Sequence, residues 1–306
     1  MDIYNAVKDF AGRRGLSFGI CGAEEFSEAK ALLEGADTPF VTKDINKRVN
    51  PSMHLKNAGS AVVVGLKQVS LKKIIESDAE ENEQSGIISS LGAYEDYHSV
   101  VKKHLAEMAE YLLKRINFKY KIFVDGGALN ERALAVRAGL GFAAPNGCVI
   151  SRELGAFWYV GCLLTDLKID FKRSDTIHAC PDGCEICVGA CPTGAIKKIN
   201  GENRVEACGC ISYLTQKDGP LSQSEKINLN GQLYGCDVCR RVCPLNKPED
   251  VPPETRLNLK NLVGIDEAKF AERFGKTAMG WRGFEILRRN ANALHENNSL
   301  NRRAAD

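Results

Sequence analysis

Apolar residues recur along this chain with two different periods, which indicate helices in some stretches and strands in others. Residues 2–14 place apolar side chains at helical spacing, and residues 96–115 carry a longer stripe of the same kind. The run at 61–66 is instead continuous, β-branched and bounded by turn residues, which is typical of a buried strand. Further strands are expected at 16–21, 120–125, 149–150 and 157–164.

Polar stretches separate these elements. Residues 76–90 are acidic and polar, so we expect an exposed loop or lid there. Strands that alternate with helices predict an α/β or α+β domain over residues 1–172, the part of the chain in which we expect any cofactor and substrate to bind. Residues 251–306 are expected to form a C-terminal helical segment that packs back on the core.

Nine of the twelve cysteines lie between positions 180 and 243. Two arrays in this stretch read Cys-x2-Cys-x3-Cys-Pro, and they end at Cys191 and at Cys243. Cys180 precedes the first array, while Cys208 and Cys210 lie between the two. This part of the chain therefore concentrates soft metal ligands.

The spacing is typical of ferredoxins that hold two [4Fe–4S] clusters, in which three thiolates bind one cluster and the cysteine before proline binds the other. The predicted ligands of one cluster are Cys180, Cys184, Cys187 and Cys243, and those of the other are Cys191, Cys210, Cys236 and Cys239. Cys208 is an alternative to Cys210 as a ligand of the second cluster. Three residues separate Cys180 from Cys184, where ferredoxins usually have two. We expect a ferredoxin-like double [4Fe–4S] domain over residues 173–250.

Two other uses of these cysteines are less compatible with the pattern. Zinc ribbons also pair Cys-x2-Cys loops, but they do not need a third cysteine followed by proline, twice. Structural disulfides need an oxidising compartment. The N-terminus lacks a basic region followed by an apolar one, so we read no export signal and expect a cytoplasmic protein whose thiols stay reduced.

Composition narrows the function further. The 306 residues are 44% hydrophobic, which suits a globular protein of one large and one small domain. Basic and acidic residues nearly balance, and the net charge of +2 does not indicate a nucleic-acid-binding or membrane-surface protein. The apolar runs are too short to cross a bilayer, so we expect no membrane association.

Two iron–sulfur clusters pass electrons one at a time and need an acceptor. We expect the acceptor's site to lie in the α/β domain. The strand at 62–66 is not followed by the Gly-x-Gly-x-x-Gly fingerprint of dinucleotide-binding folds. Asp125 ends a strand and opens a Gly-Gly turn, which makes it a candidate proton donor. Simpler interpretations stay open: Asp125 forms an Asx-turn, His98 packs on its helix face, and Arg48 is a solvated loop charge.

The cysteine stretch resembles that of the epoxyqueuosine reductases, a cobalamin- and [4Fe–4S]-dependent family related to reductive dehalogenases that completes queuosine formation in tRNA. The resemblance rests on Cys-Pro-Thr-Gly-Ala at 191–195, Cys-Ile-Ser-Tyr-Leu-Thr at 210–215 and the segment 234–246. It extends to Asp96-Tyr97-His98, Val124-Asp125 and Glu131-Arg132, and so covers nearly the whole chain. The chain resembles a shortened form of the family, without its C-terminal helical repeats.

The resemblance implies a cobalamin-dependent reductase that removes oxygen, or another leaving group, from its substrate, with epoxyqueuosine in tRNA as the family's substrate. It implies base-off cobalamin without a histidine ligand to cobalt, and Asp125 as the proton donor. The residues it places at the cofactor are Arg48, His98, Asp125, Asn146 and Ser212. Reduced ferredoxin or flavodoxin is the expected electron donor, and the protein is expected to be a monomer.

The chain departs from the family's pattern at three places. Gly126-Gly127-Ala128 stands where the family has Thr-Gly/Ala-Pro, Ala144-Pro145-Asn146 replaces Gly-Lys-Asn, and Cys162 replaces a glutamate. These changes alter the expected wall of the cofactor pocket. They keep a second function open, namely an electron-transfer protein or reductive activator of another corrinoid protein.

Overall fold

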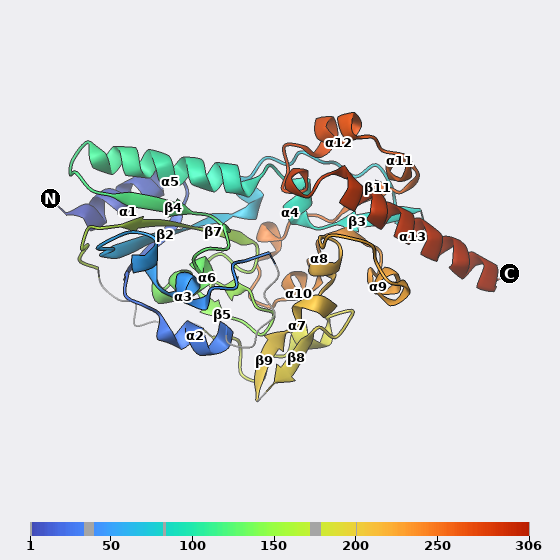
Figure 1. Ribbon diagram of the computed structural model, residues 1–306, viewed down its shortest axis with the longest axis horizontal. Helices are drawn as coiled ribbons and strands as arrows, with labels where there is room; N and C mark the ends of the chain where they lie inside the picture. The colour runs from blue at the N-terminus through green and yellow to red at the C-terminus, as the bar shows by residue number, and fades with distance from the viewer. Residues whose placement is uncertain (1, 34–39, 82–83, 172–178, 200, 306) are drawn as a thin grey trace. The chain divides into compact units, whose positions relative to one another are not determined.

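The computed structural model describes residues 2–33, 40–81, 84–171, 179–199 and 201–305 (Figure 1). The chain divides into two compact units, and each unit gathers three separate stretches. The first unit comprises Met1–Ser70, His98–Cys184 and Cys243–Asp250; the second comprises Leu71–Tyr97, Glu185–Val242 and Val251–Asp306. These units differ from the three contiguous domains predicted above, and the predicted boundary at 172/173 lies outside the described residues.

The first unit is built on a four-stranded sheet in the order β1-β2-β7-β4. These strands are Ser17–Gly22, Ser60–Lys67, Trp158–Thr165 and Tyr120–Phe123. Every neighbouring pair is antiparallel, with Val63 opposite both Gly19 and Cys162. The mixed fold of helices and strands is confirmed, and the antiparallel register makes this unit α+β.

Helices cover both faces of this sheet (Figure 1). Helix α5, Tyr97–Leu113, packs closely on one face, because a Cβ at Gly161 would lie 2.4 Å from Val101. Helix α6, Glu131–Arg137, packs on the other, where a Cβ at Gly19 would lie 2.1 Å from the carbonyl of Ala138. Glycine is needed at both positions since any side chain would separate helix from strand.

The remaining elements of the first unit are short, apart from the N-terminal helix. They are α1 (Ile3–Arg13), α2 (Ser27–Leu33), α3 (Ile45–Val49), η1 (Pro51–Met53), η2 (Gln68–Ser70), β5 (Phe142–Ala143), β6 (Val149–Ile150) and η4 (Pro248–Asp250). The core between α6 and the sheet is apolar and includes the thiols of Cys21 and Cys162. These two cysteines are therefore core residues, as small apolar side chains often are.

The second unit contains a three-stranded sheet in the order β10-β3-β11. Its strands are Gln232–Tyr234, Ser85–Ile88 and Thr255–Asn258. The central strand β3 lies within residues 76–90, so the expectation of an exposed loop there was wrong for this part. A Cβ at Gly86 would lie 3.0 Å from both Leu233 and Leu259, closer than side chains usually pack, which fits a glycine where the sequence pattern lacks an apolar side chain. Pairing of β3 with both flanking strands joins residues 71–97 to the second unit.

Helix α13, Phe284–Ala305, packs on strand β10 of this sheet and on helices α9 (Gln223–Asn228) and α11 (Lys260–Val263). Asn290 is fully buried and donates two hydrogen bonds, to the carbonyls of Thr215 (2.8 Å) and Leu233 (2.9 Å). The Arg289 guanidinium donates to the carbonyl of Leu214 at 3.0 Å. The C-terminal helix therefore fixes the chain between the two cysteine arrays.

The other elements of this unit are a hairpin and short helices. They are α4 (Ser90–Ala93), α7 (Ile186–Gly189), β8 (Ile196–Ile199), β9 (Glu202–Val205), η3 (Ala207–Gly209), α8 (Ile211–Leu214), α9 (Gln223–Asn228), α10 (Val238–Arg241), α11 (Lys260–Val263), α12 (Glu267–Phe274) and η5 (Gly280–Arg282). Within the described residues, no helix has the length and apolar character needed to cross a membrane.

Candidate functional site

Four of the predicted cluster ligands, Cys191, Cys210, Cys236 and Cys239, lie in the second unit, and all are partly buried. Burial is the main cause that raises the pKa of Cys236 to about 12, and the nearby thiols of Cys210 and Cys191 raise it further. The three sulfurs therefore lie close enough to repel one another when ionised. Binding of iron would release their protons and replace this repulsion with metal–thiolate bonds.

Cys191 sits at the end of α7 in a turn that supplies hydrogen bonds to its sulfur. Burial alone would raise the pKa of its thiol, but donors from Thr193, Ala195 and Ile196 together lower it. The Ala195 N–H lies 3.3 Å from Sγ, and the Thr193 hydroxyl oxygen lies 3.8 Å from it. Such donors stabilise a thiolate, as a cluster ligand requires.

Cys180, Cys184 and Cys243 lie in the first unit, while Cys187 belongs to the second. Burial raises the pKa of Cys180, and the thiols of Cys184 and Cys243 add to this effect. Cys180 and Cys243, 63 positions apart in sequence, are thus brought together, as the exchange of ligands between the two arrays requires.

The two candidates for the fourth position of one cluster differ in exposure. Cys208 is exposed, whereas Cys210 is partly buried and is the one whose charge acts on Cys236. Among the residues the structure describes, no three Cys, His, Asp or Glu side chains surround a point closely enough to hold a single metal ion. A cubane separates its ligands further than one ion does, because iron atoms occupy different corners.

The loop around Cys236 is held from both sides by polar contacts. The Gly235 N–H donates to the Thr215 hydroxyl at 2.9 Å, and Asp237, only 4% exposed, accepts from Ser89 and Ser90. Burial would raise the pKa of Asp237, but the Arg240 charge and the serine donors outweigh it and lower the pKa. The sequence prediction missed Asp237, although an acid between two ligand cysteines was visible.

Asp125 follows strand β4 and begins a tight turn in the first unit. Its φ of 46° is left-handed, a conformation that Asp tolerates better than most residues, and Gly127 follows with φ 68°. The Asp125 side chain is 68% exposed, and its Oδ2 lies 4.0 Å from Nε2 of His98 at the start of α5. The structure therefore brings two predicted site residues together at an accessible point.

Glu131 lies directly behind this turn and is buried. Asn130 caps α6 by accepting the Ala133 N–H at 3.2 Å, which places Glu131 at the first helical position. Its Oε1 accepts the Gly126 N–H at 3.2 Å. Burial raises the pKa of Glu131 to about 7, and the charge of Asp125 also raises it, against hydrogen bonds that lower it. The sequence motif contained Glu131, but nothing in it indicated burial.

The remaining predicted cofactor contacts divide between the units. Arg48 is 5% exposed, so its interpretation as a solvated charge was wrong; among the described residues none accepts a hydrogen bond from its Nε. Burial lowers the pKa of Arg48, as does the charge of Arg132. Asn146 is buried and accepts the Cys148 N–H at 3.1 Å. Ser212 belongs to the second unit, where its Oγ accepts from Gln216 at 3.2 Å.

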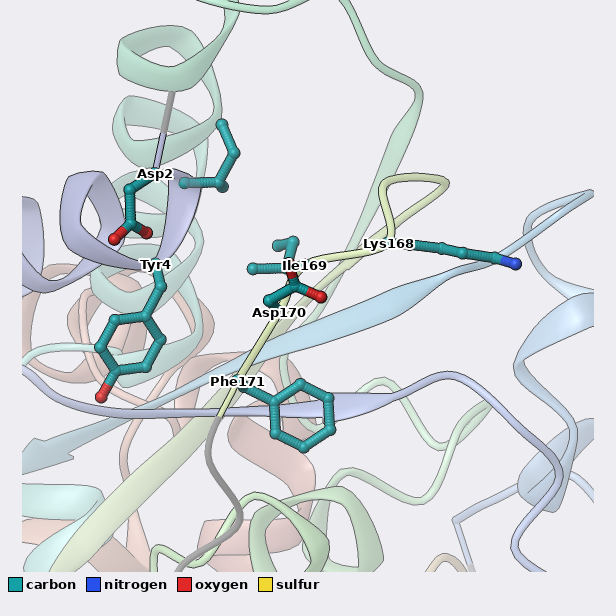
Figure 2. Close-up of a pocket in the computed structure, with 7 residues that line it drawn as sticks. Asp2, Tyr4, Lys168, Ile169, Asp170 and Phe171 are labelled. Atoms are coloured by element: carbon teal, nitrogen blue, oxygen red, sulfur yellow. The ribbon is translucent and has the colours of Figure 1, made fainter.

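A pocket in the first unit lies at the start of α1 and beyond the end of β7 (Figure 2). It is lined by Asp2, Ile3, Tyr4, Lys168, Ile169, Asp170 and Phe171. None of the predicted site residues lines it. We therefore do not assign the cofactor to this pocket.

Two family models match the chain. Residues 48–126 match the family described as epoxyqueuosine reductase QueG, DUF1730, and residues 179–246 match the 4Fe-4S double cluster binding domain. The first match contains Arg48, His98 and Asp125, and the second contains all eight predicted cluster ligands. The second match confirms the predicted pair of [4Fe–4S] clusters.

Curated proteins and solved structures agree with these models. The chain is 33% identical over 288 residues to an epoxyqueuosine reductase of Lactococcus garvieae, covering 89% of this chain and 80% of that one. It resembles the structure of an epoxyqueuosine reductase with an epoxyqueuosine-modified tRNA-Tyr stem loop, with a TM-score of 0.82 and 31% identity over 95% of this chain and 80% of that chain. A Bacillus subtilis epoxyqueuosine reductase whose catalytic aspartate loop is swung out of the active site matches with the same TM-score, identity and coverage.

Proposed function

The chain belongs to the epoxyqueuosine reductase family, and we propose that it reduces epoxyqueuosine to queuosine in tRNA. The observation that carries this proposal is the likeness to such enzymes over nearly the whole chain, in sequence and in structure. The reaction breaks both C–O bonds of the epoxide and forms a C=C bond. It consumes two electrons and two protons, and the oxygen leaves as water.

The electrons are proposed to enter from reduced ferredoxin or flavodoxin in the cytoplasm and to pass through the two clusters one at a time. Cys180, Cys184, Cys187 and Cys243 are the proposed ligands of one cluster, and Cys191, Cys210, Cys236 and Cys239 those of the other. The mutual effect of Cys191, Cys210 and Cys236 supports the second set, and that of Cys180, Cys184 and Cys243 supports the first. The protein is proposed to act as a monomer.

The residues of the first unit are compatible with a bound corrinoid. Arg48 is buried with an Nε hydrogen that meets no acceptor among the described residues, a cost that a cofactor oxygen would relieve. Cobalamin, when bound, supplies low-valent cobalt for electron transfer to the substrate carbon. Arg48, His98 and Asn146 are proposed to hold it in this unit. His98 is not proposed as a cobalt ligand.

Asp125 is proposed to supply a proton at its Oδ2 during the reaction. Its exposure allows a proton to be replaced from solvent, and Nε2 of His98 lies 4.0 Å from that oxygen. The buried carboxyl of Glu131 lies behind the turn and holds the Gly126 amide, so it fixes the backbone next to Asp125. The backbone next to Asp125 is therefore held by Glu131, while the Asp125 side chain stays accessible to solvent.

The test is a single-turnover assay under anaerobic conditions. The full chain, reconstituted with iron, sulfide and cobalamin, is mixed with an epoxyqueuosine-containing tRNA stem loop and a low-potential reductant, and the nucleosides are identified by mass spectrometry. Conversion to queuosine supports the proposal, with the unmodified stem loop as control. If iron is taken up but cobalamin is not, and no queuosine forms, the chain is an electron carrier and the proposal is wrong.

A further inference from the structure

Cys243 differs from the other three proposed ligands of its cluster in how the chain can place it. Cys180, Cys184 and Cys187 follow one another closely, so the local turns of one loop can set the spacing of their sulfurs. Cys243 comes from a distant part of the chain, and no local spacing relates it to these three. Its position must therefore be fixed by tertiary contacts.

The short segment that begins at Cys243 is held by the first unit. Cys243–Asp250 belongs to that unit, although the chain on either side of it belongs to the second. Within the segment, the Asn246 N–H donates to the Cys243 carbonyl at 3.1 Å, and the Asp250 N–H donates to the Lys247 carbonyl at 2.9 Å. These turns make the segment compact, so a contact that fixes Asn246 also fixes the backbone of Cys243.

The side chain of Asn246 attaches the beginning of this segment to the sheet. Its Oδ1 accepts the Ala156 N–H at 2.9 Å, two residues before strand β7 begins at Trp158. The neighbouring Gly155 has φ 66°, and a Cβ there would lie 2.9 Å from the same Oδ1 and 3.3 Å from the Asn246 Cα. Glycine at this position therefore allows the two backbones to approach each other.

An ion pair attaches the other end of the segment. The Lys67 Nζ lies 2.9 Å and 2.7 Å from the two carboxylate oxygens of Asp250. The Asp250 side chain is 7% exposed, so solvent screens this pair weakly. Lys67 ends strand β2 and is the partner of Trp158 in strand β7. Both attachments, the Asn246–Ala156 hydrogen bond and the Lys67–Asp250 ion pair, therefore lie at the same end of the sheet.

We propose that Asn246 and Lys67 are positioning residues that hold Cys243 where it completes one of the two [4Fe–4S] clusters. The proposal rests on the clusters of the proposed function, and it adds that the sheet of the first unit places the fourth ligand. Without the two attachments the backbone at Cys243 can shift. A cubane bound by only three thiolates then has one iron without a protein ligand, and the cluster is lost.

The experiment measures iron, sulfide and the electron paramagnetic resonance of the reduced full chain, reconstituted anaerobically without tRNA or cobalamin. Asn246→Leu removes the acceptor with little change in size. It is expected to lower iron from about eight toward about four per chain and to remove the signal of one cluster. Asn246→Asp keeps an acceptor oxygen and is expected to retain both clusters. The proposal is overturned if Asn246→Leu retains full iron, or if Asn246→Asp loses as much iron as Asn246→Leu.

The ion pair is tested by a second set of variants. Lys67→Met leaves the buried carboxylate of Asp250 without its cation and is expected to lower iron in the same way, whereas Lys67→Arg keeps a cation and is expected to retain it. Arg14→Met is the matched control, because it breaks another ion pair of the first unit, between Arg14 and Glu107 (2.8 Å). Equal loss of iron in Lys67→Met and Arg14→Met would indicate a general loss of stability and would overturn the proposal.

If Asn246→Leu does not fold, Lys67→Met decides, and full iron in that variant overturns the proposal. The measurement does not depend on turnover. A chain that loses one cluster in these variants but does not act on epoxyqueuosine-tRNA would retain the positioning role and lose the proposed function. Variants that keep all their iron would remove the positioning role and leave the proposed function intact.

Discussion

The loop around Cys236 and the turn around Asp125 differ in how firmly the chain holds them. In the loop, Asp237 is 4% exposed and its carboxylate accepts four hydrogen bonds. In the turn, Asp125 is 68% exposed, and the neighbouring Gly126 donates one hydrogen bond to Glu131. One region is braced by buried polar contacts, while the other presents its side chain to solvent.

This difference matches what each region has to do. Cluster ligands must keep their geometry through every electron transfer, and buried hydrogen bonds supply that rigidity. A proton donor must be reloaded after each turnover, which requires access to solvent or substrate. We therefore expect changes in the loop to cost cofactor, and changes in the turn to cost turnover while the cofactors stay bound.

The largest effect is expected from Cys210→Ala. Loss of one ligand of the second cluster should lower iron from about eight to about four per chain and abolish multiple turnover. Cys208→Ala is the matched control, since Cys208 lies two residues away and is exposed. Iron content and absorbance of the anaerobically purified variants test this. Full iron in Cys210→Ala with half in Cys208→Ala would reverse the assignment.

Asp125→Asn should leave iron and cobalamin content unchanged and lower the rate of queuosine formation by about 10²–10⁴-fold, the usual contribution of a proton-transferring group. Asn has nearly the same size, so the turn can persist. Asp9→Asn, an exposed carboxylate on α1, is the control for charge in the same unit. Equal rates for Asp125→Asn and the unmodified chain would remove Asp125 from the mechanism.

The contrast also separates what the sequence could predict about the site from what it could not. Metal ligands repeat at fixed spacing, so the two arrays could be recognised without any structure. Glu131 and Asp237 carry no such spacing, because their burial depends on segments far away in sequence, such as Ser89 and Ser90 for Asp237. The residues that hold a site in place can therefore be recognised only once the tertiary structure is known.

The same limit applies to the fold. Strand β2 and helix α5 were predictable because each buries a continuous apolar run or stripe. Strand β3 was missed because its four residues include Ser85 and Gly86, and the tight contact of Gly86 with Leu233 is visible only in the folded chain. The two units were missed because the chain crosses between them, which local composition does not record.

Glu131→Gln should change the pH dependence of stability. Burial is the main reason that the Glu131 pKa rises from 4.5 to about 7, so the folded state holds a proton that the unfolded state has lost. The Glu131 carboxyl makes its full contribution to the free energy of unfolding below pH 4.5. About 3 kcal/mol of this free energy is lost as pH rises to about 7. Between about pH 5.5 and 8 the unmodified chain should lose about 2 kcal/mol more than Glu131→Gln. Denaturant unfolding at both pH values measures it; parallel curves for the two proteins would contradict the assignment.

The smallest effect is expected from the two glycines of the turn, which form a matched pair. Gly127 has φ 68°, and a Cβ there would lie 3.1 Å from Val41, so Gly127→Ala should destabilise the chain by about 1–2 kcal/mol. A Cβ at Gly126 meets nothing within 4 Å, so Gly126→Ala should change stability by less than about 0.5 kcal/mol. Thermal unfolding of both variants compares these costs. Because Gly127 sets the direction of the turn, its variant should also slow turnover without loss of iron, whereas equal effects at the two glycines would mean that the turn's shape does not position Asp125.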